Sequence, residues 1–312
     1  MSTEASWPKI VVVGAGAVGG YFGGMLARAG APVIFIGRRA FVEAVKKDGL
    51  FLDTTQFQER VRAEASSDLS AVRGAEIVLF CVKTTDTAET AGALAPLLAR
   101  DAMVVSLQNG ADNVERIREA SGIEALPAVV YVAAAMPEPG HIKHFGRGDL
   151  VIGPEEARTR RVASVFERAG VPCRISENID GELWTKLVWN CALNALSALG
   201  RTTYGEIVAS AEARKLVENT VFEVLAVAKA AGIQPPGLED PRKALAGAFK
   251  IAEQMSATRS STAQDMARGK RTEIDSLNGY VAKRGEELGV PTPVNQALAA
   301  LVKLAEKNFV QP

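Results

Sequence analysis

Three polar side chains recur at helical spacing in a segment of the chain that is otherwise apolar. Between Leu183 and Leu196, the residues Lys186, Asn190 and Asn194 stand at positions i, i+4 and i+8, which places them on one face of the predicted helix. A buried lysine is costly and buried amides need hydrogen-bond partners, but burial also lowers the pKa of a lysine, which lets it act as a general acid. We interpret the stripe as the wall of a substrate site. The alternative is a hydrogen-bonded seam between helices, with the lysine extending to solvent.

A glycine-rich loop near the N-terminus has the spacing of a phosphate-binding turn. It follows the apolar run Ile10–Val13, opens a predicted helix, and comprises Gly14, Ala15, Gly16, Ala17, Val18 and Gly19. In such loops the first glycine permits the tight turn, the second lets the backbone approach a pyrophosphate, and the third allows close packing of helix on strand. The helix N-terminus then offers free N–H groups to the anion. The loop predicts a dinucleotide site; the alternative is a glycine-rich turn without a ligand.

The residue at the end of the second strand selects between the two nicotinamide cofactors. NAD-binding chains tend to place a carboxylate there, about 20 residues on, to accept from the ribose 2′-OH. This chain has Gly37-Arg38-Arg39 at that point. A guanidinium pairs with a 2′-phosphate, whereas a carboxylate repels it. Arg38 therefore favours NADP(H) over NAD, unless it is a solvated loop arginine.

Further polar residues follow later strands or stand in later polar segments. Lys83 follows one buried strand and Gln108-Asn109-Gly110 follows the next, at the ends where ligands bind in such sheets. Each is equally well a turn residue, since Asn-Gly favours turns for its own reasons. In the segments Ser260–Asp265 and Arg271–Asp275, serine could cap a helix and Glu273 could belong to a surface ion pair. The spacing alone slightly favours a structural role for these two segments.

The apolar periodicity predicts an N-terminal doubly wound, Rossmann-type α/β domain over residues 1–177 and an all-helical domain over 178–312. The predicted strands are Ile10–Val13, Val33–Ile36, Ile77–Val82, Met103–Leu107, Val129–Ala134 and Val171–Ile175, with added edge strands at His141–Phe145 and Leu150–Ile152. The helices predicted among them are Gly20–Ala29, Thr87–Ala99, Asp112–Ala120 and Glu155–Ala169. The helices predicted after them are Leu183–Leu199, Ala213–Ala231, Pro241–Ala257, Arg271–Leu288 and Asn295–Asn308.

Composition narrows the classes of partner. Lys plus Arg and Asp plus Glu number 36 each, a balance that argues against nucleic acid and anionic membrane as partners. The three cysteines are far apart and form no CxxC pair, so we expect no disulfide scaffold, no metal site and a cytoplasmic location. Glycines dilute the uncharged stretch Ile10–Ala27, which argues against a membrane span. The helical half has enough apolar surface for a homodimer, although no heptad pattern specifies one.

These residues, in this order, resemble the ketopantoate reductases (2-dehydropantoate 2-reductases). The resemblance runs from about residue 9 to residue 305. Its most diagnostic element is the family block Arg-x-Thr-Glu-Ile-Asp-x-x-Asn-Gly, present here as Arg271 to Gly279 with one spacing compressed. The late Pro-Thr-Pro-x-Asn also matches. One departure is Asn194-Ala-Leu-Ser, where the family often has Asn-Pro-Leu-Thr.

The resemblance implies an activity: NADPH reduces the 2-oxo group of ketopantoate to give pantoate, a step toward pantothenate. It implies that Lys186 is the general acid, and that Glu273 binds near the nicotinamide ribose and the substrate hydroxyl. It implies that Ala135 touches the nicotinamide through its backbone. It further implies that the carboxylate and hydroxyl ends of the 2-oxo acid are held by Asn109, Asn190, Asn194 and Ser261.

Three other functions stay open at this point. The first is reduction of another branched 2-oxo acid, because the family includes members whose substrates are not established. The second is a different NADP-dependent dehydrogenase of the 2-hydroxyacid or opine type, which would not need Ser261 and Glu273 together with the asparagines. The third is a non-enzymatic NADP(H) sensor, which has no use for a costly buried acid. We interpret His141 and His144 as structural residues, since Lys186 already supplies the proton.

Overall fold

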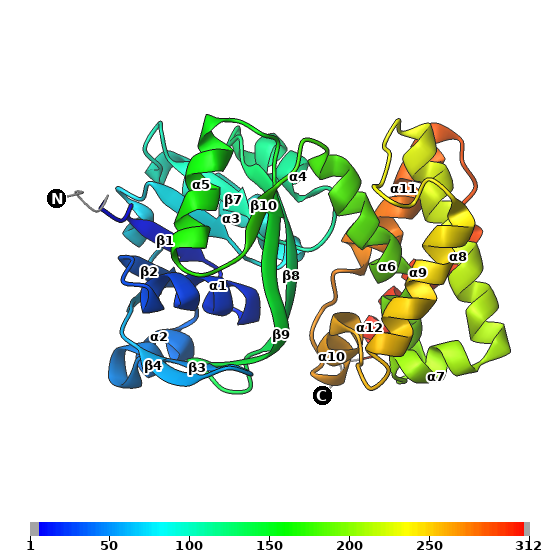
Figure 1. Ribbon diagram of the computed structural model, residues 1–312, viewed down its shortest axis with the longest axis horizontal. Helices are drawn as coiled ribbons and strands as arrows, with labels where there is room; N and C mark the ends of the chain where they lie inside the picture. Colours follow the sequence, from blue (N-terminus) through cyan, green and yellow to red (C-terminus); the bar gives the residue numbers. More distant parts are fainter. Residues whose placement is uncertain (1–5, 309–312) are drawn as a thin grey trace. The chain divides into compact units, whose positions relative to one another are not determined.

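The computed structural model describes residues 6–308. The chain divides into two compact units (Figure 1). One consists of the residues up to Asn109 together with Asn113–Ile179, and the other of Gly110–Asp112 together with the residues from Asp180 onward. The first unit contains all the described strands, and the second consists of helices and loops.

The N-terminal unit is built on a ten-stranded sheet. Its strands are β1 (Ile10–Val13), β2 (Val33–Ile36), β3 (Leu50–Asp53), β4 (Gln58–Val61), β5 (Glu64–Ser66), β6 (Ile77–Phe80), β7 (Met103–Ser106), β8 (Leu126–Ala135), β9 (His141–Ile152) and β10 (Cys173–Ile175). Six of them run parallel in the spatial order β5-β2-β1-β6-β7-β8. In chain order this is 3-2-1-4-5-6, the doubly wound arrangement in which ligands bind beyond the carboxyl ends of the strands where the order reverses.

Helices cover both faces of this sheet. They are α1 (Ala17–Arg28), α2 (Arg39–Asp48), α3 (Thr87–Leu94), α4 (Asn113–Ser121) and α5 (Ala157–Arg168), with short 3-10 turns η1 (Leu69–Val72), η2 (Thr84–Asp86) and η3 (Ala95–Leu97). Along β1, Ile10 and Val12 pack in one apolar cluster with α1, α2 and α5. The alternate residues Val11 and Val13 pack in a second cluster with α3 and α4. The predicted doubly wound fold is confirmed, and β1 is buried on both faces because both layers are present.

The prediction of two added edge strands at His141–Phe145 and Leu150–Ile152 is wrong. The two runs belong to one strand, β9, which lies between β3 and β8 inside the sheet. The intervening Gly-Arg-Gly-Asp does not break the strand, because two register irregularities against β8 accommodate it. Arg147 adopts a positive φ of 57° there, and its guanidinium lies 4.0 Å over the Tyr131 ring.

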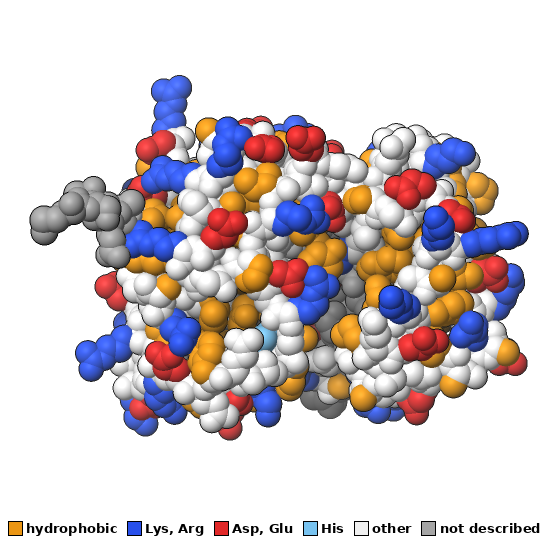
Figure 2. Space-filling model, viewed as in Figure 1, with side chains coloured by type: hydrophobic (Ala, Val, Ile, Leu, Met, Phe, Trp, Pro, Cys, Tyr) orange, Lys and Arg blue, Asp and Glu red, His pale blue; other side chains and the backbone are white. Residues whose placement is uncertain are grey.

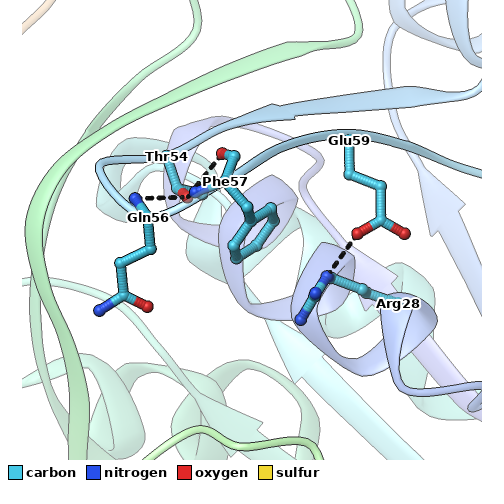
Figure 3. A network of polar contacts seen from close by, with 5 residues as sticks. All are labelled: Arg28, Thr54, Gln56, Phe57 and Glu59. Carbon is cyan, nitrogen blue, oxygen red and sulfur yellow. Dashed lines mark hydrogen bonds and ion pairs between the residues drawn. The ribbon is translucent and has the colours of Figure 1, made fainter.

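The hairpin β3–β4, which the sequence pattern did not predict, is held by polar contacts (Figure 3). In its turn, the Thr54 hydroxyl accepts from the N–H of Phe57 and donates to the carbonyl of the same residue, at 2.8 and 2.7 Å. Arg28, at the end of α1, donates to Glu59 on β4 at 2.7 Å and lies 4.0 Å over the Phe57 ring. Because β4 is mostly exposed, it carries no apolar periodicity.

The C-terminal unit packs its helices around a polar network as well as an apolar core. Its helices are α6 (Ile179–Leu199), α7 (Tyr204–Ala209), α8 (Ala211–Ala230), α9 (Pro241–Gln254), α10 (Ser261–Ala267), α11 (Asn278–Leu288) and α12 (Pro293–Lys307), with the 3-10 turn η4 (Ile274–Ser276). The Glu223 carboxylate on α8 accepts from the N–H groups of Val294 and Asn295 at 2.9 Å each and so caps α12. Asn278 then donates to Asn295 and to the carbonyl of Cys191.

The prediction of one helix over Arg271–Leu288 is wrong at its N-terminal end. The N–H of Thr272 donates to Glu306 on α12 at 2.7 Å, and the hydroxyl of Thr272 accepts from the N–H of Ile274. These contacts take the backbone out of the helical ladder, so that only η4 forms before α11 begins at Asn278. Side chain–backbone hydrogen bonds of this kind compete with helix formation.

The surface carries both basic and acidic side chains, and the described helices have no membrane-spanning character. On the face that Figure 2 draws, basic and acidic side chains are interspersed over each unit. Among residues 6–308, no helix combines the length and apolar character that are needed to cross a membrane.

A capping box begins α7. The Thr203 hydroxyl accepts from the N–H of Glu206, and the Glu206 carboxylate accepts in return from the Thr203 N–H at 2.8 Å. The Thr202 hydroxyl also donates to this carboxylate at 2.6 Å. The hydrogen bonds from Thr202 and Thr203 lower the pKa of Glu206 from its ordinary 4.5 to about 2.

We predict that Glu206→Gln destabilises the chain in a pH-dependent way. Because folding lowers the pKa of Glu206 to about 2, its stabilisation is complete above about pH 4.5 and is lost as the pH falls toward 2. The urea midpoint of the variant should therefore lie below that of the parent at pH 7, and the gap should shrink at pH 3. Glu253→Gln, which removes an exposed charge on α9, is the control. A gap of equal size at both pH values would contradict this account.

Candidate active site

The glycine loop has the geometry of a phosphate cradle. Gly14 adopts a φ of +97°, and a Cβ there would lie 2.6 Å from the backbone of Cys81 at the end of β6. A Cβ on Gly19 would lie 2.5 Å from the Gly14 carbonyl oxygen and 2.8 Å from Val12 Cγ1. At Gly16, by contrast, an added Cβ would meet no atom within 4 Å. Two glycines thus bring α1 close to the sheet, and the third leaves open space in front of the helix N-terminus.

Hydrogen bonds fix this loop to the end of β2, where Arg38 follows. The N–H groups of Gly14 and Ala15 both donate to the Ile36 carbonyl at 3.1 Å. Arg38 is exposed at the N-cap of α2, two residues beyond that carbonyl. An arginine is therefore held beside the cradle, which is where a 2′-phosphate would need a cationic partner.

A buried amide, Gln108, joins the ends of β6 and β7. Its amide nitrogen, Nε2, donates to the Val82 carbonyl at 3.0 Å and to the Thr87 hydroxyl at 2.7 Å, while Oε1 accepts from Ser106 at 3.0 Å. These hydrogen bonds fix the backbone just before Lys83 and Asn109. Lys83, exposed, comes directly after Val82, and Asn109, half-buried, comes directly after Gln108.

The carbonyl of Asn109 is held in turn by the side chains of Asn113, at 2.6 Å, and Thr84, at 3.4 Å. The loop after β7 is therefore fixed from both α4 and η2. The glycine loop, Arg38, Lys83 and Asn109 all follow the carboxyl ends of neighbouring parallel strands, so the structure brings them to one edge of the sheet. Burial raises the pKa of the Cys81 thiol beneath the loop, which keeps that thiol neutral.

Ala135 lies farther along its strand than the other predicted cofactor residues lie beyond theirs. It ends the long strand β8, where it pairs with Lys143 of β9. Pro127, eight residues earlier, is the β8 residue that pairs with the end of β7. At about 3.3 Å per residue, Ala135 lies well beyond the level of the other strand ends, and its contact with the nicotinamide stays a prediction.

In the C-terminal unit, the polar stripe predicted from the sequence lies on α6. Lys186 and Asn190 are half-buried, and Asn194 is 4% exposed. The Oδ1 atom of Asn194 accepts a hydrogen bond from the Tyr204 hydroxyl at 3.0 Å. At Asn194 the structure thus contains a hydrogen bond between helices, the alternative that the sequence left open. Lys186 and Asn190 keep partial access to solvent, as a substrate site requires.

The two serines of the segment before α10 have different surroundings. Ser260 is buried; its hydroxyl caps α10 by accepting from the Ala263 N–H and donates to the Asn194 carbonyl on α6, both at 3.0 Å. Its N–H donates to the Ser197 hydroxyl at 3.1 Å. Ser261, the first residue of α10, is exposed. Ser260 therefore has a structural role that fixes Ser261 relative to Asn194, and a substrate contact by Ser261 stays a prediction.

Glu273 is half-buried at the N-cap of η4. Its neighbour Ile274 packs in one small apolar cluster with Ala195 of α6, while Met266 of α10 packs against that cluster. Each of these apolar residues lies close in sequence to a predicted site residue, namely Glu273, Asn194 or Ser261. The cluster therefore holds together the three elements that carry these side chains.

Some functional assignments could not have come from the sequence. Tyr204 follows a loop after α6 and has no spacing signal, although it holds Asn194. Conversely, Asn278 belongs to the diagnostic block but is fully buried in the core network, so its role is structural.

Within residues 6–308, the histidine, cysteine and acidic side chains form no group of three that could hold a metal ion.

The doubly wound sheet, the open glycine cradle and the arginine beside it define a dinucleotide-binding protein. Comparison with known sequences matches the family described as ketopantoate reductase PanE/ApbA over residues 10–157 and its C-terminal part over residues 178–306. The chain belongs to the ketopantoate reductase family. It is accordingly an NADP-dependent oxidoreductase.

Individual relatives agree over nearly the whole chain. The 2-dehydropantoate 2-reductase of Halobacterium salinarum is 32% identical over 307 residues, covering 96% of this chain and 99% of the relative. The protein of the same name from Pyrococcus horikoshii is 33% identical and covers 96% and 97%. A crystal structure of a PanE/ApbA family ketopantoate reductase from Ralstonia eutropha superposes with a TM-score of 0.92 at 48% identity, covering 97% and 100%.

We predict that alanine at Gly16 weakens cofactor binding, whereas alanine at Gly19 weakens folding. Gly16→Ala should leave the free energy of unfolding unchanged and weaken NADPH binding by at least about tenfold, because the methyl group enters the space left for the pyrophosphate. Gly19→Ala should lower the free energy of unfolding by about 1–3 kcal/mol, because its methyl group overlaps the Gly14 carbonyl. Urea unfolding and NADPH fluorescence titration measure the two effects. Tight NADPH binding by Gly16→Ala would refute the cradle.

Proposed function

We propose that this chain uses NADPH to reduce the 2-oxo group of 2-dehydropantoate (ketopantoate), giving pantoate for pantothenate biosynthesis. The observation that carries the proposal is the stripe of Lys186 and Asn190, half-buried on an otherwise apolar helix, together with a dinucleotide cradle in the same chain. The names of the full-length relatives from Halobacterium and Pyrococcus support the substrate.

When bound, NADPH would supply a hydride to the carbon of the oxo group, and the chain supplies the proton. As negative charge builds on the carbonyl oxygen, the ammonium of Lys186 stabilises that oxygen and then donates its proton from Nζ. The balance is one hydride and one proton added to the 2-oxo acid, leaving the 2-hydroxy acid, the oxidised cofactor and a neutral lysine that regains a proton from water. Asn109, Asn190, Asn194 and Ser261 offer hydrogen bonds to the carboxylate and hydroxyl ends of the substrate, and Glu273 orients the hydroxyl.

On the cofactor side, we assign the 2′-phosphate of NADPH to Arg38 and the pyrophosphate to the loop from Gly14 to Gly19. The exposure of Arg38 and the open space at Gly16 support this assignment. Lys83, exposed at the end of β6, adds a second positive charge at the same edge of the sheet.

The function is tested by following NADPH consumption with 2-dehydropantoate. We predict that Lys186→Met, which keeps the apolar stem and removes the proton donor, lowers kcat by roughly 10²–10⁴-fold. Lys215→Met, at an exposed position on α8, is the matched control and should turn over like the parent. No turnover of 2-dehydropantoate by the parent, with rapid turnover of another branched 2-oxo acid, would keep the chemistry and replace the substrate. NADPH binding without turnover of any 2-oxo acid would favour a sensor.

We further predict that Arg38→Ala weakens NADPH binding by roughly 10–100-fold, the range expected for a charged hydrogen bond, and leaves NADH binding unchanged. Arg39→Ala is the matched control, since Arg39 is also exposed but pairs with Glu43 at 2.7 Å. KM values for the two cofactors measure the effect. An equal loss of affinity for NADPH and NADH would mean that Arg38 does not contact the 2′-phosphate.

A further inference from the structure

Asn194 is the most deeply buried residue of the α6 stripe, and its side-chain oxygen bonds to a neighbouring helix. Oδ1 accepts from the hydroxyl of Tyr204 at 3.0 Å, and both side chains are more than 90% buried. Burial raises the pKa of Tyr204 to about 12, so the phenol stays protonated and donates at every working pH. The amide of Asn194 is therefore held in one orientation, with Oδ1 toward α7.

The remaining polar atom of Asn194 is a donor. Nδ2 has no hydrogen-bond partner among the described residues, and it is not one of their buried unpaired polar atoms, so it reaches solvent through the exposed edge of the side chain. Because Oδ1 faces Tyr204, the other side of the amide presents Nδ2, which is a donor. A ligand that meets Nδ2 must present an acceptor atom.

Tyr204 is itself fixed by its surroundings. Its N–H donates to the Thr258 carbonyl at 3.0 Å, and the next N–H, of Gly205, donates to the Ser256 carbonyl at 2.9 Å. The capping box of Thr203 and Glu206 fixes the start of α7 from the other side. The phenol is therefore a rigid support and not a flexible surface group.

The position of Asn194 on α6 indicates which part of the substrate it meets. Eight residues separate it from Lys186, which is about 12 Å along the helix axis. Lys186 acts on the carbonyl oxygen, to which the carboxylate is directly adjacent. The oxygen of 2-dehydropantoate that lies farthest from this pair is the terminal hydroxyl, two carbons beyond the oxo group.

We propose that Tyr204 is a positioning residue for substrate selection: it orients the Asn194 amide so that Nδ2 donates to the terminal hydroxyl oxygen of the 2-oxo acid. The proposal rests on the proposed reduction of 2-dehydropantoate. It adds Tyr204, a residue outside the predicted site. It also predicts a preference for hydroxylated 2-oxo acids, since the protein donates and the substrate hydroxyl accepts.

The test compares two substrates with each variant. The first is 2-dehydropantoate, and the second is its analogue in which hydrogen replaces the terminal hydroxyl. Tyr204→Phe removes only the phenolic oxygen, and we expect it to lower kcat/KM for 2-dehydropantoate by about five- to tenfold, the value of one hydrogen bond. The same variant should change kcat/KM for the analogue by less than about twofold.

Ser197→Ala is the control in the same neighbourhood. It removes a hydroxyl that donates to the Thr202 carbonyl and accepts from Ser260, without touching the Asn194 side chain. We expect it to leave the ratio of the two substrates unchanged, whatever it does to stability. An equal loss of both substrates in Tyr204→Phe would overturn the positioning role and leave the reductase intact. Absence of turnover of either substrate by the parent would overturn the proposed function and, with it, this inference.

Discussion

Gln108, just after β7, and Asn194, within α6, are buried amides, and their hydrogen bonds connect the elements of each unit. Gln108 joins the loops after β6 and β7 through three hydrogen bonds, which sets the positions of Lys83 and Asn109. Asn194 is linked to α7 through its side chain and to the start of α10 through its backbone carbonyl. A buried amide left unpaired costs about 1–3 kcal/mol, so each of these loops has one strongly favoured arrangement. Of the candidate site residues, Lys83, Asn109 and Ser261 stand on the loops and the helix end that this requirement fixes.

The glycine loop is governed by the opposite requirement, the absence of side chains. Gly14 and Gly19 let backbone and helix approach to distances that any Cβ would prevent, while Gly16 keeps a space clear. The N–H groups of Gly14 and Ala15 bond to the end of β2, which carries the chain directly to Arg38. The loop proposed for the pyrophosphate and the arginine proposed for the 2′-phosphate are thus linked through a single carbonyl, that of Ile36.

Much of the architecture was predictable because apolar periodicity reports burial. The bounds of β1 and β2 agree with the prediction residue for residue, and the stripe on α6 follows from helical spacing alone. The hairpin β3–β4 was not predicted. The residues of β4 pair with β3 through the backbone, but most of their side chains are exposed, so the strand shows no apolar periodicity. Tyr204 was not predicted because its contact with Asn194 depends on a loop whose path is fixed by tertiary hydrogen bonds. The roles of Ser260 and Asn278 likewise required the packed structure, because a buried serine or asparagine has the same sequence signal as one in a binding site.

The central claim is that this chain transfers a hydride from NADPH to the oxo carbon of a 2-oxo acid. The most direct measurement uses NADPH deuterated at the transferred position of the nicotinamide, with 2-dehydropantoate in ordinary water and the product examined by NMR. The account predicts pantoate with deuterium on the carbon that bore the oxo group and with a hydroxyl proton that exchanges with solvent. Consumption of NADPH with no deuterium in pantoate, or with no pantoate formed, would contradict it.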